Sequence, residues 1–270
     1  MPLVTKDDKP TWLWRDSRDA LRRYFKWLIG AIIVLIGARY IGGQTMWVFV
    51  FDAPEQAADF VSRMIPPDFT YMRRIVPALW DTINIAVFGT AGAVLISIPV
   101  AILAAKNTTP HAFVRAIAMT IIVVSRSVNS LIWALLIVQV VGPGLFAGVL
   151  AIAIRSIGMI SKLTYETIEE IDRDPIEAIT ATGASRTQVF IYGFVPQLLP
   201  AFVGVSVYRW EVNIRESTII GLVGGGGIGF LLNSAINRLA WDQAIVVLVT
   251  ILATVVLAEA VSARIRRAVT

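Results

Sequence analysis

Long apolar stretches constrain this chain more than any other feature of its sequence. A helix needs about 20 mostly apolar residues to cross the hydrocarbon core of a bilayer, which is about 30 Å thick. About six such stretches occur, at 27–43, 80–105, 116–141, 145–163, 198–223 and 244–261. Only 16% of the 270 residues are charged, whereas a soluble domain carries about 25%. We therefore expect an all-α polytopic membrane protein with about six transmembrane helices.

The composition also excludes several kinds of chemistry. The chain has no cysteine, which excludes disulfides, thiolate catalysis and cysteine-bound metals, and its one histidine, His111, argues against histidine metal sites and catalytic triads. The basic residues cluster at the ends of apolar stretches and form no stripe of the kind that binds nucleic acid. We expect no catalytic residues, no metal site and no nucleic-acid partner.

The basic residues predict the orientation in the membrane, because cytoplasmic loops are enriched in Lys and Arg. With six spans, the segments on the side of the two termini hold 15 Lys and Arg, and the opposite segments hold 4. Both termini are therefore predicted to be cytoplasmic. The first stretch lacks a convincing cleavage site, which favours an uncleaved anchor over a signal peptide.

This topology divides the chain into segments. We predict a cytoplasmic arm over 1–26, a first transmembrane helix over 27–43, an external connection over 44–79, a core of about five transmembrane helices over 80–263 with a cytoplasmic loop at 164–196, and a tail over 264–270. The arm alternates apolar and charged residues, so it is either an interfacial helix or a solvated segment; its apolar residues are Trp12, Leu13, Trp14, Leu21, Tyr24 and Phe25. In the external connection we expect short interfacial helices, with Pro54, Pro66 and Pro67 as breakers.

The cytoplasmic loop at 164–196 has the pattern of two short helices. An acidic run ends at Asp174, Pro175 suits a first helical turn, and Gly183 suits a helix C-cap. A second short helix is predicted to run to Pro196. Two short helices joined at a glycine would form a rigid projection that can dock in a partner's groove, although a simple hairpin between two spans would give the same pattern.

Glu177 and Ala178, followed by Gly183 and later by Pro196, resemble the EAA loop of ABC-importer permeases. Ile179 departs from that pattern, as does the segment 193–195. Three further segments, 192–197, 208–215 and 221–229, resemble the phosphonate-importer permeases in particular, and methionine-importer permeases are the nearest rivals. The resemblance extends from residue 79 to the C-terminus.

The resemblance implies a type I ABC-importer permease in a bacterial inner membrane. It implies a homodimer of this chain, two cytoplasmic ATPase subunits that bind ATP and Mg, and an extracytoplasmic binding protein, with no cofactor on this chain. The substrate would be a phosphonate or a related phosphorus oxyanion such as phosphite, phosphate or a phosphate ester. The coupling residues would be Glu177, Ala178, Gly183, Ala184 and Arg186.

Nucleotide binding by this chain itself is not expected. The sequence has no Gly-Lys pair and therefore no G-x-x-x-x-G-K-[ST] loop. Gly224, Gly226 and Gly229 satisfy G-x-G-x-x-G but follow a membrane span instead of a strand. We expect Gly224, Gly225, Gly226, Gly227 and Gly229 to serve as a hinge or in tight packing, with exposed amides that attract an anion as the second interpretation.

Charged and polar residues inside the spans are candidates for the translocation pathway, because each is costly at that depth. On a continuous third helix Arg126, Asn129, Ser130 and Trp133 would share one face that suits an oxyanion. The alternative is that Arg126 pairs with an acid and locks the bundle.

The fifth span carries two charge sets. Arg209, Asn213 and Glu216 share one face, and Glu211 and Arg215 lie four residues apart on another. Arg155 in the fourth span is a possible partner for either glutamate. One set is expected to be structural and the other to line the pathway, and the sequence does not distinguish them.

Three other classes of function are considered. A methionine or other small-solute ABC permease would share the loop, and an ion-coupled secondary transporter would use the intramembrane acids as proton carriers and show inverted repeats. An intramembrane enzyme has little support, because H-E-x-x-H and G-x-S-x-G motifs are missing.

Overall fold

The computed structural model describes residues 3–6, 9–12 and 17–269, and it divides the chain into two units, residues 1–59 and 60–270. In the first unit, strands β1 (Leu3–Lys6) and β2 (Lys9–Trp12) pair antiparallel, so a short hairpin precedes the helices. Of the apolar residues predicted in the arm, Leu13 and Trp14 lie outside the described residues, and Leu21, Tyr24 and Phe25 are exposed in helix α1 (Ser17–Gln44).

Helix α1 contains the predicted first span, and large apolar side chains are exposed along it, as expected of a helix in contact with lipid. Helix α2 (Trp47–Arg63) follows. The expectation that Pro54 breaks this segment is wrong, because Pro54 lies inside α2; a proline within a helix removes one hydrogen bond and bends the helix without always ending it. The helix instead ends just before Pro66 and Pro67.

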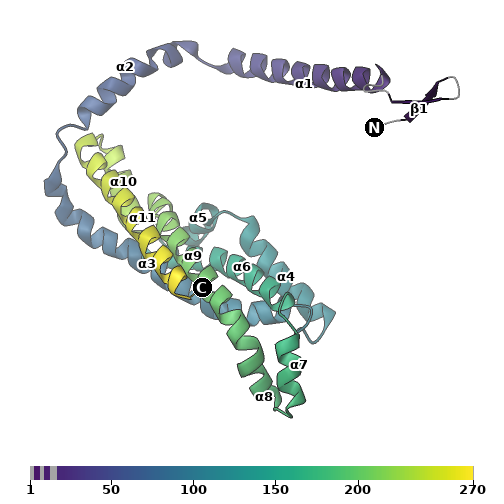
Figure 1. Ribbon diagram of the computed structural model, residues 1–270. Helices are drawn as coiled ribbons and strands as arrows, with labels where there is room; N and C mark the ends of the chain where they lie inside the picture. Colours follow the sequence, from purple (N-terminus) through teal and green to yellow (C-terminus); the bar gives the residue numbers. More distant parts are fainter. Residues whose placement is uncertain (1–2, 7–8, 13–16, 270) are drawn as a thin grey trace. The chain divides into compact units, whose positions relative to one another are not determined.

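The second unit is a bundle of long helices (Figure 1). After the short turn η1 (Phe69–Tyr71), its elements are α3 (Met72–Ala104), α4 (Ala112–Ser127), α5 (Ser130–Val141), α6 (Leu145–Glu169), α7 (Asp174–Ala181), α8 (Arg186–Val189), the π-helical turn η2 (Phe190–Phe194), α9 (Val195–Leu222), α10 (Ile228–Asn237) and α11 (Trp241–Val269). Helices α3, α6, α9 and α11 are each long and apolar enough to cross a membrane.

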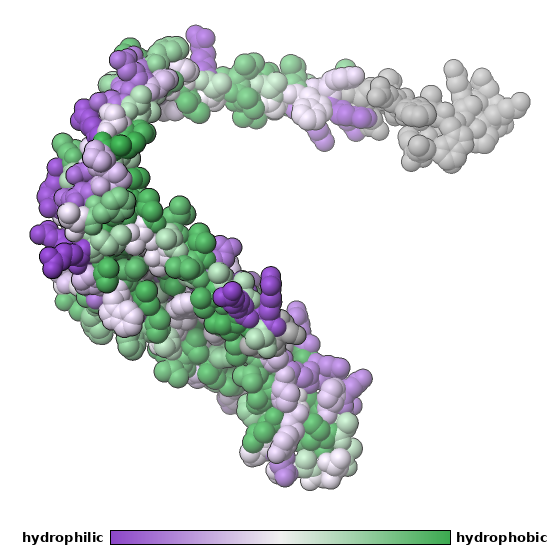
Figure 2. Space-filling view, turned by 60° about the vertical axis from the view of Figure 1, so that its left-hand side comes forward, coloured by the Kyte–Doolittle hydropathy of each residue, from purple (hydrophilic) through white to green (hydrophobic). Residues whose placement is uncertain are grey.

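Helices α3 and α6 form the centre of the bundle, and α9 packs against both. A Cβ atom on Gly89 of α3 would lie 2.6 Å from the Ile152 side chain of α6, so the two helices can approach this closely only because residue 89 is glycine. Ile85, Ile152 and Ile220 bring the three helices together in one buried cluster. Apolar residues cover much of the visible outer face, as expected for helices surrounded by lipid (Figure 2).

The predicted third span at 116–141 is broken. Helices α4 and α5 meet at an angle of 96°, and Val128 between them is extended, with φ −100° and ψ 135°. Asn129 caps α5 by accepting a hydrogen bond from the backbone N–H of Leu131 at 3.0 Å. An Asn at this position favours the start of a new helix over continuation of the old one.

The predicted second helix of the cytoplasmic loop also differs from expectation. It does not end at Pro196 but continues from α8 through η2 into α9. Pro196 therefore lies within a continuous run of helix, directly after the π-helical turn η2, where its ring removes one backbone N–H donor. Helix α7 and the α8 end of this long helix project together from the bundle (Figure 1).

Candidate functional site

The projection formed by residues 174–194, which we call the coupling knob, has well-defined ends to its helices. Pro175 occupies the first turn of α7, and Gly183 adopts φ +81° just after its C-cap. Ser185 and Gln188 form a capping box that starts α8. The left-handed conformation of residue 183 favours glycine over any residue with a Cβ.

Two contacts that the sequence did not suggest stabilise the knob: one joins the segment just before α7 to the start of α9, and the other lies between α7 and η2. The Gln197 side chain donates to the carbonyl of Asp172 at 3.2 Å and accepts from its N–H at 3.2 Å. A Cβ atom on Gly193 would lie 3.3 Å from Ile176, so glycine there lets α7 pack against η2. Of the predicted coupling residues, Glu177, Ala178, Gly183 and Arg186 are exposed and Ala184 is half-buried.

A charged cavity of about 310 Å³ lies between α4, α6 and α9. It contains three of the predicted arginines and one predicted glutamate. Its lining residues are Arg126, Arg155, Met159, Tyr208, Arg209, Val212 and Glu216. These side chains come from three helices, and the sequence could not show that they meet.

Glu216 lies between two of the arginines. Its Oε1 is 3.3 Å from Nε of Arg155, and its Oε2 is 3.1 Å from Nη2 of Arg209. The prediction that Arg155 pairs with a glutamate of the fifth span is confirmed for Glu216. Three guanidinium groups and one carboxylate leave this cavity with two positive charges in excess.

Arg126 is the exception among the charged groups of the cavity. No ion pair to Arg126 is found among the described residues, and its side chain is exposed at the last turn of α4. The prediction that Arg126, Asn129, Ser130 and Trp133 share one helix face is wrong, because the chain bends between Arg126 and the other three. The bend has a use: the freed carbonyl of Val128 accepts a hydrogen bond from Nη1 of Arg155 at 3.2 Å.

A serine that the sequence analysis missed joins α4 to α6 beside the cavity. The Ser125 hydroxyl donates to the carbonyl of Ile154 and accepts from the N–H of Gly158, so it bridges two backbone groups that would normally bond to each other within α6. A Cβ atom on Gly158 would lie 2.7 Å from the Ser125 oxygen and 2.8 Å from Cγ of Arg126. Glycine at 158 therefore allows the stem of Arg126 to lie directly on α6.

Arg209 is held from behind by a buried polar network. Its Nε donates to the Ser156 hydroxyl at 2.9 Å. Asn213 donates to the same hydroxyl at 3.0 Å and to Thr90 at 2.7 Å. Ser156 and Asn213 are fully buried, so the network fixes Arg209 from α3, α6 and α9 together. Asn213 supports the cavity but does not line it.

Glu211 and Arg215 form a separate cluster on another face of α9. Glu211 accepts from Arg215 at 3.1 Å and from Arg266 of α11 at 3.1 Å. Arg266 also donates to Ser262. Glu211 and Arg215 do not line the charged cavity, and neither Arg266 nor Ser262 was predicted as a partner.

The glycine-rich segment is tightly packed. Gly224, Gly226 and Gly227 have φ of +96°, +81° and +74°. A Cβ atom on Gly225 would collide with Ile220, and one on Gly229 would collide with the carbonyl of Thr218. The amide that starts α10, that of Ile228, donates to Thr82 at 2.7 Å. These contacts support the packing interpretation over the exposed-amide one.

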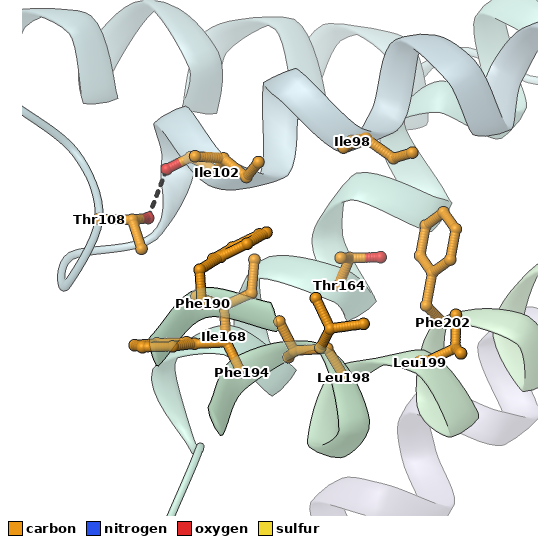
Figure 3. A pocket seen from close by; sticks show the side chains of 11 residues that line it. Ile98, Ile102, Thr108, Thr164, Ile168, Phe190, Phe194, Leu198, Leu199 and Phe202 are labelled. Carbon is orange, nitrogen blue, oxygen red and sulfur yellow. Dashed lines mark hydrogen bonds between the residues drawn. The ribbon is translucent and has the colours of Figure 1, made fainter. Parts of the chain in front are cut away.

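A second cavity, of about 260 Å³, lies where the knob joins α9 (Figure 3). Aromatic and aliphatic side chains such as Phe190, Phe194 and Phe202 surround it. Its polar members are few: Thr108 is bonded to the carbonyl of Ile102 at 2.6 Å, and the hydroxyl of Thr164 has no partner among the described residues. Such a cavity offers no charged group to an anion.

Comparisons with known proteins match this architecture. The family of binding-protein-dependent transport system inner membrane components matches residues 97–269. A phosphite transport system permease protein of Stutzerimonas stutzeri is 38% identical over 235 residues, which are 87% of this chain and 85% of that protein. A phosphate-import permease protein of Mycolicibacterium smegmatis is 38% identical over 218 residues, which are 81% of this chain and 41% of that protein.

Among solved structures, the MetNI methionine ABC transporter in an inward-facing conformation has a TM-score of 0.64 at 23% identity, over 75% of this chain and 99% of that chain. This likeness shows the type I importer fold. The family works with a binding protein and with partner subunits that use ATP, so an ion-coupled secondary transporter is set aside. The chain belongs to the family of binding-protein-dependent transport system inner membrane components and is a non-catalytic, multi-pass permease subunit of an ABC importer in the inner membrane.

Proposed function

We propose that this permease conducts a phosphorus oxyanion, such as phosphite, phosphate or a phosphonate, through the charged cavity between α4, α6 and α9. The observation that carries the proposal is the charge balance of the cavity, with Arg126, Arg155 and Arg209 against Glu216 alone. A phosphate group carries about −1.5 to −2 charges at pH 7, which matches an excess of two positive charges. Arginine also offers paired N–H groups that suit phosphate oxygens.

The relatives support the same substrate class. The two permeases compared above are named for phosphite and phosphate, and each is 38% identical to this chain. The methionine transporter shares the fold at 23% identity. Methionine carries no net charge at neutral pH and would leave the two excess positive charges uncompensated.

The complete importer in this proposal contains two copies of the chain, two cytoplasmic ATPase subunits and one extracytoplasmic binding protein. Both termini face the cytoplasm, as the distribution of Lys and Arg predicts. The charged cavities of the two copies would then be exposed in turn to the two sides of the membrane as the spans rock.

The substrate is tested by ATPase stimulation of the reconstituted complex with its binding protein, over a panel of phosphite, phosphate, methylphosphonate, sulfate and methionine. We expect stimulation by at least one phosphorus oxyanion and none by methionine. Stimulation by methionine alone would reject the proposal. Uptake of the same solutes into vesicles provides the second readout, because it also detects transport that is poorly coupled.

The coupling knob is proposed to dock on the ATPase subunit through Glu177, Ala178, Gly183, Ala184 and Arg186. Its support is the exposed projection of α7 and α8. Replacing Gly183 with leucine should strain the turn by about 1–2 kcal/mol and reduce uptake per ATP hydrolysed. The control is Thr187→Ala, an exposed position in α8. Unchanged coupling in Gly183→Leu, with normal assembly, would count against this role.

A further inference from the structure

Glu216 occupies the place in the charged cavity that an incoming oxyanion would need. Its two carboxylate oxygens face two different guanidinium groups, Arg155 at 3.3 Å and Arg209 at 3.1 Å. The side chain of Glu216 is only 13% exposed. An anion that binds Arg155 and Arg209 through these nitrogens competes with this carboxylate for their N–H groups.

We propose that Glu216 is a built-in competitor of the substrate: it holds Arg155 and Arg209 while the cavity is empty and yields both to a phosphorus oxyanion in transit. This inference rests on the proposed function and adds the mechanism of release. Arg126 makes the first contact, because no ion pair to it is found among the described residues and it lines the same cavity. The anion then displaces Glu216 from the two other arginines.

Both arginines keep their positions when Glu216 moves away, because each has a second anchor. Arg209 donates to Ser156 at 2.9 Å, and Arg155 donates to the carbonyl of Val128 at 3.2 Å. These anchors belong to α6 and to the bend between α4 and α5, so they do not depend on Glu216. The guanidinium pair is therefore ready for a second anion of similar geometry.

Such a competitor meets two electrostatic needs: it stabilises the empty cavity and it allows the bound anion to leave. Three uncompensated guanidinium groups at bilayer depth would be costly, and one carboxylate lowers that cost in the empty state. In the loaded state the same carboxylate stays close to the anion and repels it. A translocation site must bind its substrate weakly enough to let it leave, and Glu216 provides that weakening.

The test is equilibrium binding of inorganic phosphate and of phosphite to the permease–ATPase complex in nanodiscs, without the binding protein. Glu216→Gln keeps the size of the side chain and removes its charge, so the affinity should rise about tenfold or more, as expected when a like charge within a few ångströms of an anion is removed. Release of the bound anion should slow by a similar factor, and uptake should fall because release becomes limiting.

Glu211→Gln is the matched control. Glu211 lies on the same helix and also pairs with two arginines, but outside the cavity. The affinity of this variant for phosphate should stay within about twofold of the wild type, since Glu211 contacts Arg215 and Arg266 and none of the guanidinium groups of the cavity. An equal rise in both variants would show a general charge effect and overturn the inference.

A conservative variant covers the case in which Glu216→Gln does not fold. Glu216→Asp keeps the charge but shortens the side chain, so it cannot reach both arginines at hydrogen-bond distance. Its affinity should rise by a smaller factor, about threefold, as the contacts of the competitor weaken. Unchanged or weaker binding in Glu216→Asp would overturn the inference.

The outcomes separate this inference from the proposed function. If the wild type imports phosphite or phosphate but Glu216→Gln binds them no more tightly, the competitor role is wrong and the substrate assignment stands. If the wild type imports no phosphorus oxyanion, the proposed function fails whatever the binding data show. Tighter binding with slower uptake in Glu216→Gln supports the inference.

Discussion

Helix α9 carries two clusters in which a glutamate pairs with two arginines. The two clusters differ in the groups that surround them. Glu211 is buried and Glu216 is half-buried, and each carboxylate accepts from two arginines. The Glu216 cluster gathers groups from three helices around a cavity and includes a third arginine, Arg126. The Glu211 cluster joins α9 to α11 through Arg266 and Ser262.

Residue type alone does not distinguish residues of a translocation pathway from residues of a structural ion pair. Ion pairs at helical spacing are present in both clusters, so the sequence pattern is the same. An excess of positive charge next to open volume marks the Glu216 cluster as the one able to receive an anion. The Glu211 cluster has its cations arranged along the outer surface, where Arg215 and Arg266 are 45% and 35% exposed.

The largest difference between the clusters should appear in stability. Arg209→Met removes a buried cation, leaves Glu216 with one ion-pair partner and leaves Ser156 with one donor, Asn213, instead of two. We expect a loss of about 3–5 kcal/mol in the free energy of unfolding, the usual cost of breaking a buried pair. Arg266→Met should cost at most about 1 kcal/mol, since Arg266 is partly exposed and Glu211 keeps Arg215. Denaturant titration of the purified permease measures both.

Equal losses in the two variants would contradict the distinction between the buried Arg209 and the partly exposed Arg266. Arg73→Met, at an exposed arginine outside both clusters, serves as the reference for the effect of losing an arginine. A small loss in Arg209→Met would mean that Arg155 alone can satisfy Glu216.

The next largest difference should appear in transport. Arg126→Ala removes an exposed cation of the cavity and should leave stability nearly unchanged. Uptake of the phosphorus oxyanion should fall about 10- to 100-fold, as expected for loss of a charged hydrogen bond worth about 1.5–3 kcal/mol. Arg215→Ala, the matched change in the Glu211 cluster, should keep uptake within about twofold. Initial uptake rates in vesicles decide between them, and equal rates would remove Arg126 from the pathway.

Much of the fold could be predicted from the sequence, because apolar length and charge distribution control membrane insertion directly. Each predicted span corresponds to a helix or a helix pair, and Gly183 ends the first knob helix as expected. The break between α4 and α5 could have been suspected, since Asn129 is a strong N-cap residue. It was missed because the two apolar helices together have the length and hydropathy of one span, although residues 125–130 between them are mostly polar.

The site could be predicted only in part. Spacing along one helix correctly separated Glu211 from Glu216, because that geometry is local. Contacts between helices, such as that of Arg155 with Glu216, could be proposed but not assigned. Ser125, Ser156 and Gly158 left no signal, since small residues are common in membrane helices and their role depends on the helix that packs against them.

The smallest difference in effect between the clusters is expected when the serine beside each cluster is replaced. Ser125→Ala removes the hydroxyl that bridges Ile154 and Gly158 beside Arg155, and Ser262→Ala removes one of the two acceptors of Arg266. Each should cost about 1 kcal/mol of unfolding free energy, the typical value of one hydrogen bond. Only Ser125→Ala should also change transport, with uptake lowered several-fold at a nearly constant amount of assembled complex, because the stem of Arg126 rests on Gly158 next to this bridge. Parallel unfolding and uptake measurements separate the two effects, and a matching loss of uptake in Ser262→Ala would show that stability alone controls transport.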